Sequence, residues 1–561
     1  MMQKEIREKY ENWCRRVFDG SVSADLSTMN EEQIAEAFAS DLSFGTAGLR
    51  GIMQAGTNRM NIYTVAKASQ GLAEYLKKTV APDKRMIAVS RDSRNRSDLF
   101  SRTAAEVFAG NGIRVFLYQD IMPVPLLSYA VRELGCAAGV MITASHNPPE
   151  YNGYKVYGAD GCQITSEAAD AIQKAIEETD IFDGIRKLPF EEGMEQGLIQ
   201  WIDGSVYDSF IETVKSQSLI GEDIPRDCRI VYSPLNGTGL RPVLRALTES
   251  GYSRISVVPE QEEPDGNFPT CRKPNPEERE ALQLGLELAD RNGADLVMAT
   301  DPDCDRIGIA VRDENGQFVL LSGNETGMLL LDYICSRHVE TGTMPADPVM
   351  IKTIVTTDIA ERIAESYGAR TINVLTGFKY IGEQITELEK EGHPESYLLG
   401  FEESYGYLTG THVRDKDGVG TALMICDMFA YHRVGGISLL QRLEQIYEQH
   451  GYCLNSVYSY QFEGSKGSFT MERILNVLRS GVRRIGGFNV EEVKDYLDGI
   501  DGLPKANVLR FRLSSDSILI ARPSGTEPKL KFYFSVYANN RHHAQIKEKQ
   551  LLTDIDALTK I

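Results

Sequence analysis

The 561-residue sequence lacks the cysteine pattern of disulfide-bonded and zinc-ribbon proteins. Its nine cysteines are scattered and odd in number, and no two of them form a Cys-x-x-Cys pair. Such spaced pairs are typical of disulfide frameworks and of zinc ribbons. We therefore expect reduced thiols and a cytoplasmic protein.

Long apolar runs and excess positive charge are also missing. No segment approaches the roughly 20 consecutive apolar residues of a membrane-spanning helix, and the charged start, residues 1–7, differs from a secretory signal peptide. The net charge of −20 argues against nucleic acid and anionic membranes as partners. It would also repel a phosphorylated metabolite, so a site for one needs its own cations.

The remaining pattern predicts several α/β domains. The length favours three or four domains, and residues 1–40 carry apolar side chains at helical spacing. Strand-like runs then alternate with helical ones, which predicts α/β units with a mainly parallel sheet in the first. Strands are expected at 86–89, 115–118, 138–142, 229–232, 295–299, 349–354, 371–375 and 397–399. From about residue 451 the character changes, and strands at 508–512, 517–520 and 531–536 predict a small α+β domain.

A serine loop follows one of these strands. The apolar run 138–142 leads into Thr-Ala-Ser-His-Asn-Pro at 143–148, which predicts a tight turn carrying Ser145 at the ligand-binding edge of the sheet. Serine needs activation to act as a nucleophile. Because His146 is adjacent in the chain, a Ser–His dyad is geometrically awkward, and a metal or a phosphoryl group on the serine oxygen fits better. In the alternative interpretation, Ser145 and Asn147 only cap a helix.

An acidic loop follows another strand. Asp301, Asp303 and Asp305 alternate, so in an extended loop their carboxylates converge on one hard cation. Oxygen ligands suit Mg²⁺ or Ca²⁺ rather than zinc. An EF-hand is excluded because Arg306 and Arg312 occupy its glycine and glutamate positions. The alternative is a solvated acidic turn.

Three more polar loops complete the pattern. The acceptor-rich residues 402–404 are suited to grip sugar hydroxyls, or form only a charged surface turn. Residues 522–526, Arg-Pro-Ser-Gly-Thr, make a compact phosphate cradle. The glycine-rich loop 44–51 ends in a cation but is not a Walker loop. Together the loops indicate phosphoryl transfer on a phosphosugar, with the serine carrying the phosphoryl group.

Four of these segments, 143–148, 301–306, 401–406 and 522–528, resemble the motifs of the α-D-phosphohexomutase superfamily, in the same order and over nearly the whole chain. Segments 45–51 and 376–380 are most similar to its phosphoglucomutase/phosphopentomutase subgroup. The resemblance implies four domains around a central cleft: three α/β domains with mixed sheets and a smaller C-terminal α+β domain. The expected ranges are 1–205 with the phosphoserine loop, 206–322 with the metal loop, 323–450 with the sugar loop and 451–561 with the phosphate loop.

The resemblance also implies an activity. The expected enzyme is an isomerase, an intramolecular phosphotransferase that interconverts α-D-glucose 1-phosphate and glucose 6-phosphate. Phosphorylated Ser145 would form glucose 1,6-bisphosphate, which reorients and returns its other phosphate to the serine. One Mg²⁺ would be held by Ser145, Asp301, Asp303 and Asp305. The partners would be small phosphosugars, and the protein a monomer or homodimer.

The same resemblance assigns further residues. It places Ser145, His146, Lys155 and Lys416 in catalysis. Substrate-binding positions are Arg50, Arg306, Thr376, Gly377, Lys379, Glu402, Ser404, Arg522, Ser524, Gly525 and Thr526.

Two departures from the family pattern matter. Tyr405-Gly406 replaces the Gly-His of the phosphomannomutase sugar loop, which argues against dual glucose and mannose use. Cys304 stands where alanine is usual, and we expect it to point away from the ligands without functional effect. Alternative activities are phosphopentomutase, phosphomannomutase and glucose-1,6-bisphosphate synthase. A non-catalytic sugar-phosphate-binding regulator is disfavoured by the intact serine and aspartates.

Overall fold

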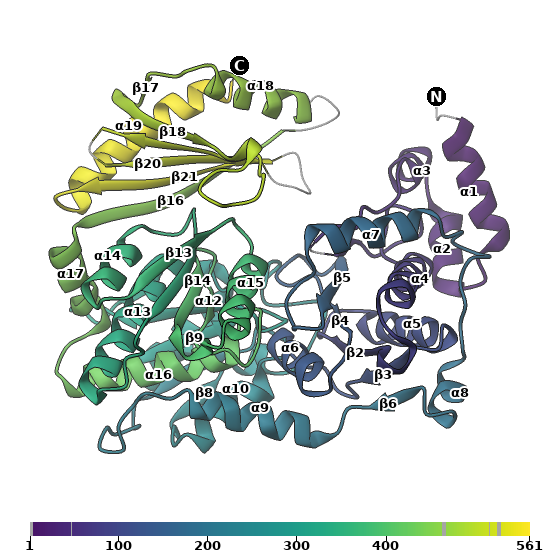
Figure 1. The fold of residues 1–561 in the computed structure, drawn as a ribbon, viewed down its shortest axis with the longest axis horizontal. Helices are drawn as coiled ribbons and strands as arrows, with labels where there is room; N and C mark the ends of the chain where they lie inside the picture. The colour runs from purple at the N-terminus through teal and green to yellow at the C-terminus, as the bar shows by residue number, and fades with distance from the viewer. Residues whose placement is uncertain (1–3, 47, 463–466, 515, 524–528, 561) are drawn as a thin grey trace. The chain divides into compact units, whose positions relative to one another are not determined.

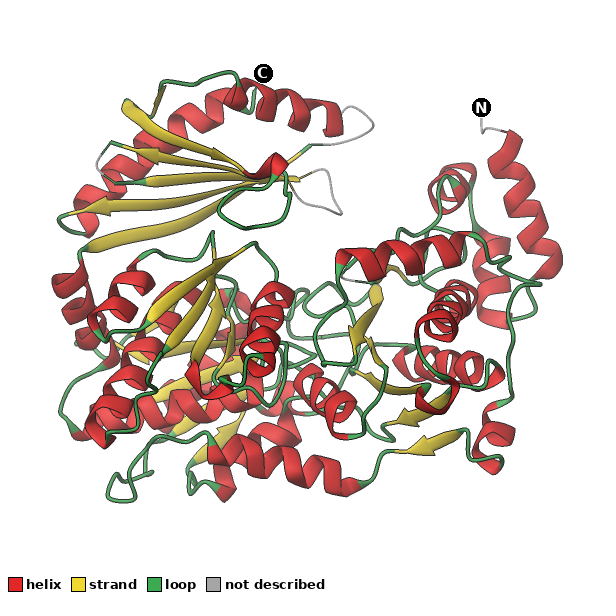
Figure 2. Ribbon diagram, viewed as in Figure 1, coloured by secondary structure: helices red, strands yellow, loops and turns green. Residues whose placement is uncertain are grey.

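The computed structural model describes residues 4–46, 48–462, 467–514, 516–523 and 529–560 (Figure 1). The chain divides into two compact units. The first unit comprises Met1–Leu321, Ile381–Pro394 and Tyr405–Tyr431, and the second comprises Ser322–Tyr380, Glu395–Ser404 and His432–Ile561. Helices and sheets alternate through both units (Figure 2).

The first unit opens with the predicted helices, α1 (Lys4–Arg16), α2 (Gly20–Thr28) and α3 (Glu31–Phe38). Asp19 caps the N-terminus of α2, and Asn30 forms a capping box at α3. The three helices share an apolar cluster in which Trp13 packs edge-on against Phe38. This small cluster explains the helical spacing of apolar residues in the first forty residues.

The first sheet has the order β1-β5-β4-β2-β3-β6. Its strands are β1 (Leu49–Ile52), β2 (Met86–Arg91), β3 (Arg114–Leu117), β4 (Ala138–Ile142), β5 (Tyr151–Gly158) and β6 (Ile199–Trp201). The pairs β4–β2, β2–β3 and β3–β6 are parallel, whereas β5 pairs antiparallel with both β4 and β1. The mainly parallel sheet is therefore confirmed, and its antiparallel edge makes it mixed.

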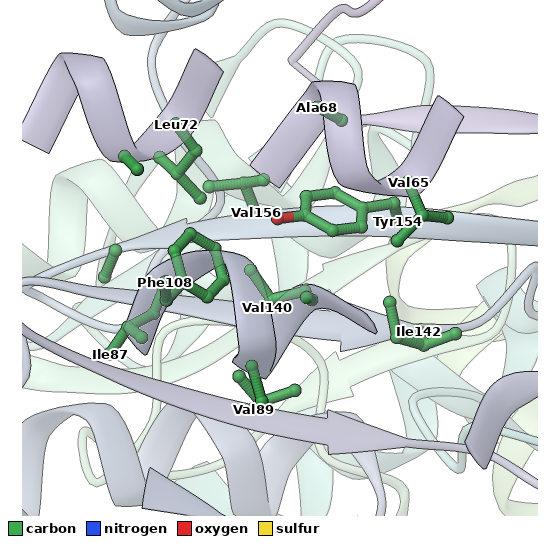
Figure 3. Packing of buried hydrophobic residues seen from close by; sticks show 14 of the residues in the cluster. Val65, Ala68, Leu72, Ile87, Val89, Phe108, Val140, Ile142, Tyr154 and Val156 are labelled. Atoms are coloured by element: carbon green, nitrogen blue, oxygen red, sulfur yellow. The ribbon is translucent and has the colours of Figure 1, made fainter. Parts of the chain in front are cut away.

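Helices cover both faces of this sheet. They are α4 (Ile62–Thr79), α5 (Ser97–Gly110), α6 (Val124–Glu133), α7 (Ser166–Glu177) and α8 (Phe190–Glu195). Figure 3 shows Val140 and Ile142 of β4 packed in one cluster with Val65 of α4 and Phe108 of α5. The intervening Met141 packs with α6 on the other face. Because successive strand residues face opposite sides, a strand covered on both faces is apolar throughout, as 138–142 is.

The second sheet, also in the first unit, has the order β11-β10-β9-β7-β8. Its strands are β7 (Ile230–Ser233), β8 (Ile255–Val257), β9 (Leu296–Thr300), β10 (Ile307–Arg312) and β11 (Phe318–Leu321). Here β8, β7 and β9 run parallel, and β10 and β11 add antiparallel. The accompanying helices are α9 (Gly204–Ser216), α10 (Leu240–Glu249), α11 (Pro259–Glu262) and α12 (Arg279–Asn292). The unit also includes β15 (Gly406–Leu408), most of α15 (Phe378–Lys390) and most of α16 (Gly418–Val434).

The second unit contains two further sheets. The first has β13 (Arg370–Val374), β12 (Val349–Thr353) and β14 (Tyr397–Glu402) side by side and parallel, with helices α13 (Gly323–Thr341), α14 (Ile359–Ser366) and α17 (Leu439–His450). The second is antiparallel, in the order β16-β21-β20-β19-β18-β17. Its strands are β16 (Tyr452–Gln461), β17 (Arg484–Ile485), β18 (Phe488–Asp495), β19 (Leu509–Leu513), β20 (Ile518–Pro523) and β21 (Lys529–Ala538), with α18 (Gly467–Arg479) and α19 (Arg541–Leu558). The expected C-terminal α+β fold is confirmed.

In the described part of the chain, every helix is too short or too polar to cross a bilayer. The expected strands are present, and their ends differ from the expected ones by at most three residues. The boundaries of the four predicted domains remain a prediction.

Candidate active site

Ser145 lies in a turn directly after β4, as the sequence predicts. The backbone φ angle of Ser145 is 51°, in the left-handed region, and the residue is 3% exposed. The Ser145 N–H donates to Thr143 Oγ1 at 2.8 Å, and its Oγ donates to Asp301 Oδ2 at 2.7 Å. The hydroxyl of the first sheet therefore meets the acidic loop of the second sheet.

The expectation that His146 is badly placed to contact Ser145 is wrong. His146 Nδ1 lies 3.1 Å from Ser145 Oγ. The left-handed backbone at Ser145 interrupts the extended alternation, and so neighbouring side chains reach each other. Burial of the ring and the nearby cations of Arg306 and Arg50 lower the pKa of His146 well below its usual value. The imidazole is therefore neutral near pH 7.

Asp301, Asp303 and Asp305 gather into one buried cluster, with one carboxylate oxygen from each within 4.8 Å of the others. The loop is a turn rather than the extended segment that the sequence suggested. Cys304 has a φ of 51° and its N–H donates to Asp301 O at 2.9 Å. Cys304 itself is fully buried, and its Sγ would lie 3.0 Å from a Cβ placed on Gly239. The turn, not strand-like alternation, brings the carboxylates together.

The acidic cluster fits a hard divalent cation. Among the described residues, Asp303 Oδ1 and Asp305 Oδ1 are buried without a hydrogen-bond partner. This arrangement is costly unless the two oxygens coordinate a cation. Burial and the neighbouring Asp303 and Asp305 raise the pKa of Asp301 well above its usual value. Burial also opposes ionisation of Asp305, but Lys416 and Lys155 outweigh it and lower the Asp305 pKa. Oxygen-only ligands of this kind suit Mg²⁺.

Two buried lysines contact the same carboxylates. Lys155, on β5 opposite Met141 of β4, places Nζ 2.7 Å from Asp303 Oδ2 and 3.3 Å from Asp305 Oδ2. Lys416 Nζ lies 3.0 Å from Asp305 Oδ2 and 3.1 Å from Asp415 Oδ1. The structure therefore brings Ser145, His146, the three aspartates and both lysines into one cluster in the first unit.

Two predicted arginines contribute local cations near this cluster. Arg50 Nη1 donates to Asn147 Oδ1 in the serine loop at 2.8 Å. Arg306, directly after the acidic loop, pairs with Glu277 Oε1 at 2.7 Å. These cations meet the requirement that a site for phosphates in an acidic protein must counter the overall charge.

The second unit brings together the predicted sugar-loop residues. Glu402 ends β14, and its Oε1 accepts the Gly377 N–H at 2.9 Å, where Gly377 has a φ of 123°. Thr376 precedes this glycine, and Lys379 Nζ lies 4.6 Å from the centroid of the Tyr380 ring. Ser404 follows β14 by two residues. The loops at 376–379 and 402–404 therefore form one polar edge of this sheet.

The phosphate loop is only partly described. Arg522 lies near the end of β20, where it pairs with Lys531 of β21. Ser524, Gly525 and Thr526 lie outside the described residues. Their predicted role remains a prediction from the resemblance.

Sequence reasoning missed two supporting residues. Asp415 accepts hydrogen bonds from Tyr157 OH at 3.0 Å and Gln163 Nε2 at 3.1 Å, and so it anchors Lys416. Arg94 donates to the serine loop. The signal for Arg94 was its place just after the apolar run 86–89, at the same strand edge as Ser145.

Known proteins share this architecture. Models of the phosphoglucomutase/phosphomannomutase α/β/α domains I, II and III match residues 41–181, 208–316 and 322–450. The phosphoglucomutase of Staphylococcus saprophyticus is 37% identical over 540 residues, which cover 94% of this chain and 96% of that protein.

Two solved structures share the fold. A putative phosphomannomutase from Thermus thermophilus has a TM-score of 0.70 at 21% identity, covering 93% of this chain and 100% of its own. The open form of Paramecium pp63/parafusin, a phosphoglucomutase, has a TM-score of 0.68 at 18% identity, covering 93% and 96%. The three matched domain models and the extended identity to a relative together show that this chain belongs to the phosphoglucomutase/phosphomannomutase family.

Proposed function

We propose that the protein is a phosphoglucomutase that interconverts α-D-glucose 1-phosphate and glucose 6-phosphate through a phosphoserine. The observation that carries this proposal is the placement of Ser145 Oγ 2.7 Å from Asp301 within a buried cluster of three carboxylates. The name of the staphylococcal relative supports glucose as the sugar. The enzyme is then an isomerase of the phosphohexomutase type.

The chemistry at Ser145 consists of two transfers. In the first, a sugar hydroxyl attacks the phosphorus carried on Ser145 Oγ, the Oγ–P bond breaks, and glucose 1,6-bisphosphate forms. In the second, Ser145 Oγ attacks the other phosphate of the reoriented bisphosphate, and the product hydroxyl leaves. Each transfer moves one proton between a hydroxyl and a general acid or base, and Lys155, Lys416 and His146 are the candidates for these two roles.

The acidic cluster supplies a cation site. Asp301, Asp303 and Asp305, with an oxygen of Ser145 or its phosphate, would hold Mg²⁺. When bound, Mg²⁺ would neutralise negative charge on the transferring phosphoryl group. The lysines then keep the remaining carboxylate charge balanced within the buried cluster.

We assign substrate recognition to the residues that the resemblance to the family implies. In the first unit, Arg50 and Arg306 would hold phosphate oxygens. In the second, Glu402 and Ser404 would accept and donate hydrogen bonds to the sugar hydroxyls, as acceptor-rich loops do. Thr376, Gly377 and Lys379 would add contacts, and Arg522 with Ser524, Gly525 and Thr526 would bind the non-reacting phosphate. Holding that remote phosphate orients the sugar for attack.

We retain the four-domain division at 1–205, 206–322, 323–450 and 451–561 as part of this proposal, with one loop contributed by each domain. A cytoplasmic location rests on the scattered, odd-numbered cysteines of the sequence, whose spacing is not that of a disulfide framework. We leave the assembly as monomer or homodimer.

The test is a coupled assay for glucose 6-phosphate with Mg²⁺, glucose 1-phosphate and a catalytic amount of glucose 1,6-bisphosphate. Wild type is expected to turn over, and Ser145→Ala to lose both turnover and phosphorylation. Ser27→Ala, on the exposed side of α2, is the control that retains both. Turnover of ribose 1-phosphate or mannose 1-phosphate but not of glucose 1-phosphate would keep the mechanism and assign a different sugar as the substrate. Inactivity on all three sugars would leave a non-catalytic binding protein.

A further inference from the structure

Arg94 follows β2 and reaches the serine loop with a guanidinium that is fully buried. We propose that Arg94 is a positioning residue for the nucleophile Ser145. It acts through the main chain of the serine loop and not through contact with the reacting atoms. The inference rests on the proposed function, because it assigns the conformation of the loop that carries the phosphoryl group.

The guanidinium donates to four carbonyl oxygens, three in the serine loop and one at the start of β5. Its Nη1 donates to Pro148 O and Tyr151 O, both at 2.9 Å. Its Nη2 donates to Ser145 O at 2.5 Å and also to Asn147 O. Buried carbonyls without donors are costly. One side chain therefore supplies donors to all four carbonyl oxygens, of which Pro148 O also accepts the Tyr151 N–H.

A planar fork of donors is what this arrangement requires. Arginine presents five N–H groups in a fixed plane, whereas lysine offers one nitrogen on a flexible stem. An ammonium at this site can satisfy only part of the set of carbonyls in one geometry. The proposal therefore predicts that charge alone, as in Arg94→Lys, is insufficient.

Both sides of Ser145 are tied to the end of β2. The carbonyl of Ser145 is held by Arg94, as described, and its N–H donates to Thr143 Oγ1. Thr143 Oγ1 in turn donates to Asp92 Oδ2 at 2.6 Å, and Arg94 Nε lies 3.4 Å from the same oxygen. Asp92 and Arg94 thus form one buried ion pair, which binds the Ser145 carbonyl directly and the Ser145 N–H through Thr143.

This pair explains the unusual backbone of Ser145. A φ of 51° is unfavourable for a residue with a Cβ, and such a conformation persists only when its surroundings fix it. The same conformation directs Oγ to Asp301 at 2.7 Å. Loss of the carbonyl contacts would let the turn relax and move the hydroxyl away from the acidic cluster.

Arg94 also contacts the segment between α11 and α12. The centroid of the Phe268 ring lies 4.9 Å from Arg94 Cζ. Asn95, the next residue in the chain, donates from Nδ2 to Asn267 Oδ1 at 2.9 Å. These residues lie between β8 and β9, and β9 ends at Thr300, just before Asp301. Arg94 and Asn95 therefore contact the segment between α11 and α12 as well as the serine loop.

The experiment compares wild type with Arg94→Lys, Arg94→Gln and the matched control Arg85→Lys. Arg85 is half-buried, and like Arg94 it donates to carbonyl oxygens, those of Val80 and Lys77, in the same domain but away from the serine loop. We expect Arg94→Lys to fold, because it keeps a cation beside Asp92. Its kcat for glucose 1-phosphate should fall about 100-fold while KM changes less than about threefold, since a small misplacement of the nucleophile acts on the chemical step. Arg85→Lys should match wild type.

Hydrogen–deuterium exchange supplies a readout that needs no sugar. The N–H groups of Asn147 and Tyr151 are bonded within the loop, to Ala144 O and Pro148 O. They should exchange faster in Arg94→Lys and Arg94→Gln than in wild type or Arg85→Lys. Arg94→Gln can fail to fold because Asp92 loses its counter-charge. In that case wild type is compared with Arg94→Lys and with Phe268→Leu, which removes the ring that packs against the guanidinium.

The outcomes separate the two proposals. A folded Arg94→Lys with kcat within about threefold of wild type overturns the positioning role. If Arg94→Lys loses about 100-fold in kcat but its loop amides exchange as in wild type, the positioning role is overturned as well. If wild type turns over no sugar phosphate, the proposed function fails, and the exchange of the loop amides alone then decides whether Arg94 fixes the loop.

Discussion

Gly237 offers a direct test of how tightly the acidic loop is held. It lies in the loop after β7, and a Cβ added there would be 2.3 Å from Pro302 Cα and 2.6 Å from Pro302 O. Both atoms are backbone, between Asp301 and Asp303. The next residue, Thr238, donates to Pro302 O from its N–H at 2.8 Å and from Oγ1 at 2.9 Å. The Gly237→Ala change therefore wedges apart two segments that hydrogen bonds hold together.

The size of the effect follows from these contacts. Carbon atoms in ordinary contact are about 3.5–4.0 Å apart, so the two segments must separate by roughly 1 Å. We expect a loss of about 1–3 kcal/mol in the free energy of unfolding from overpacking, which a domain with about 5–15 kcal/mol of stability survives. A shift of about 1 Å in groups that position the reaction lowers kcat about 100-fold.

The assay measures kcat for glucose 1-phosphate and Mg²⁺ affinity by titration calorimetry. Gly204→Ala, at the start of α9, is the control, because nothing lies within 4 Å of an added Cβ there. Gly237→Ala should bind Mg²⁺ more weakly and turn over more slowly, while Gly204→Ala should match wild type. If Gly237→Ala folds, binds Mg²⁺ and turns over as wild type does, the reasoning about this loop is refuted.

Three further predictions concern charge and packing. Burial raises the pKa of Asp427 to about 6. Between about pH 4 and 7 the folded protein therefore holds a proton that the unfolded chain releases. Over this range wild type should lose up to about 3 kcal/mol of stability relative to Asp427→Asn. Urea titrations at several pH values check this, and a pH-independent difference would contradict it. Phe108→Ala, at a fully buried ring (Figure 3), should lower the free energy of unfolding by about 3–5 kcal/mol. Phe18→Ala, at a residue 83% exposed, should change it by less than about 0.5 kcal/mol. Mg²⁺ should raise the melting temperature of the EDTA-treated protein, because it relieves repulsion within the acidic cluster, and Asp303→Asn should weaken that rise; equal shifts would argue against the cation site.

The sequence by itself determined the local features of this protein. The buried strand at 138–142, the serine turn that follows it and the three aspartates after β9 are all set by residues adjacent in the chain. Hydrophobic run length, turn residues and spacing report such features because neighbouring residues generate them. The resemblance to the family likewise depends on short contiguous motifs.

Only the tertiary structure decided which distant groups meet. Lys155 reaches Asp303, Asp415 anchors Lys416 to Tyr157, and Arg94 binds carbonyls of the serine loop. It also reversed two local expectations, since His146 contacts Ser145 and the acidic loop is a turn. These outcomes depend on how separate strands are brought to one sheet edge and on which donors surround the backbone there. Hydrogen bonds between segments far apart in the chain leave no periodic signal in the sequence.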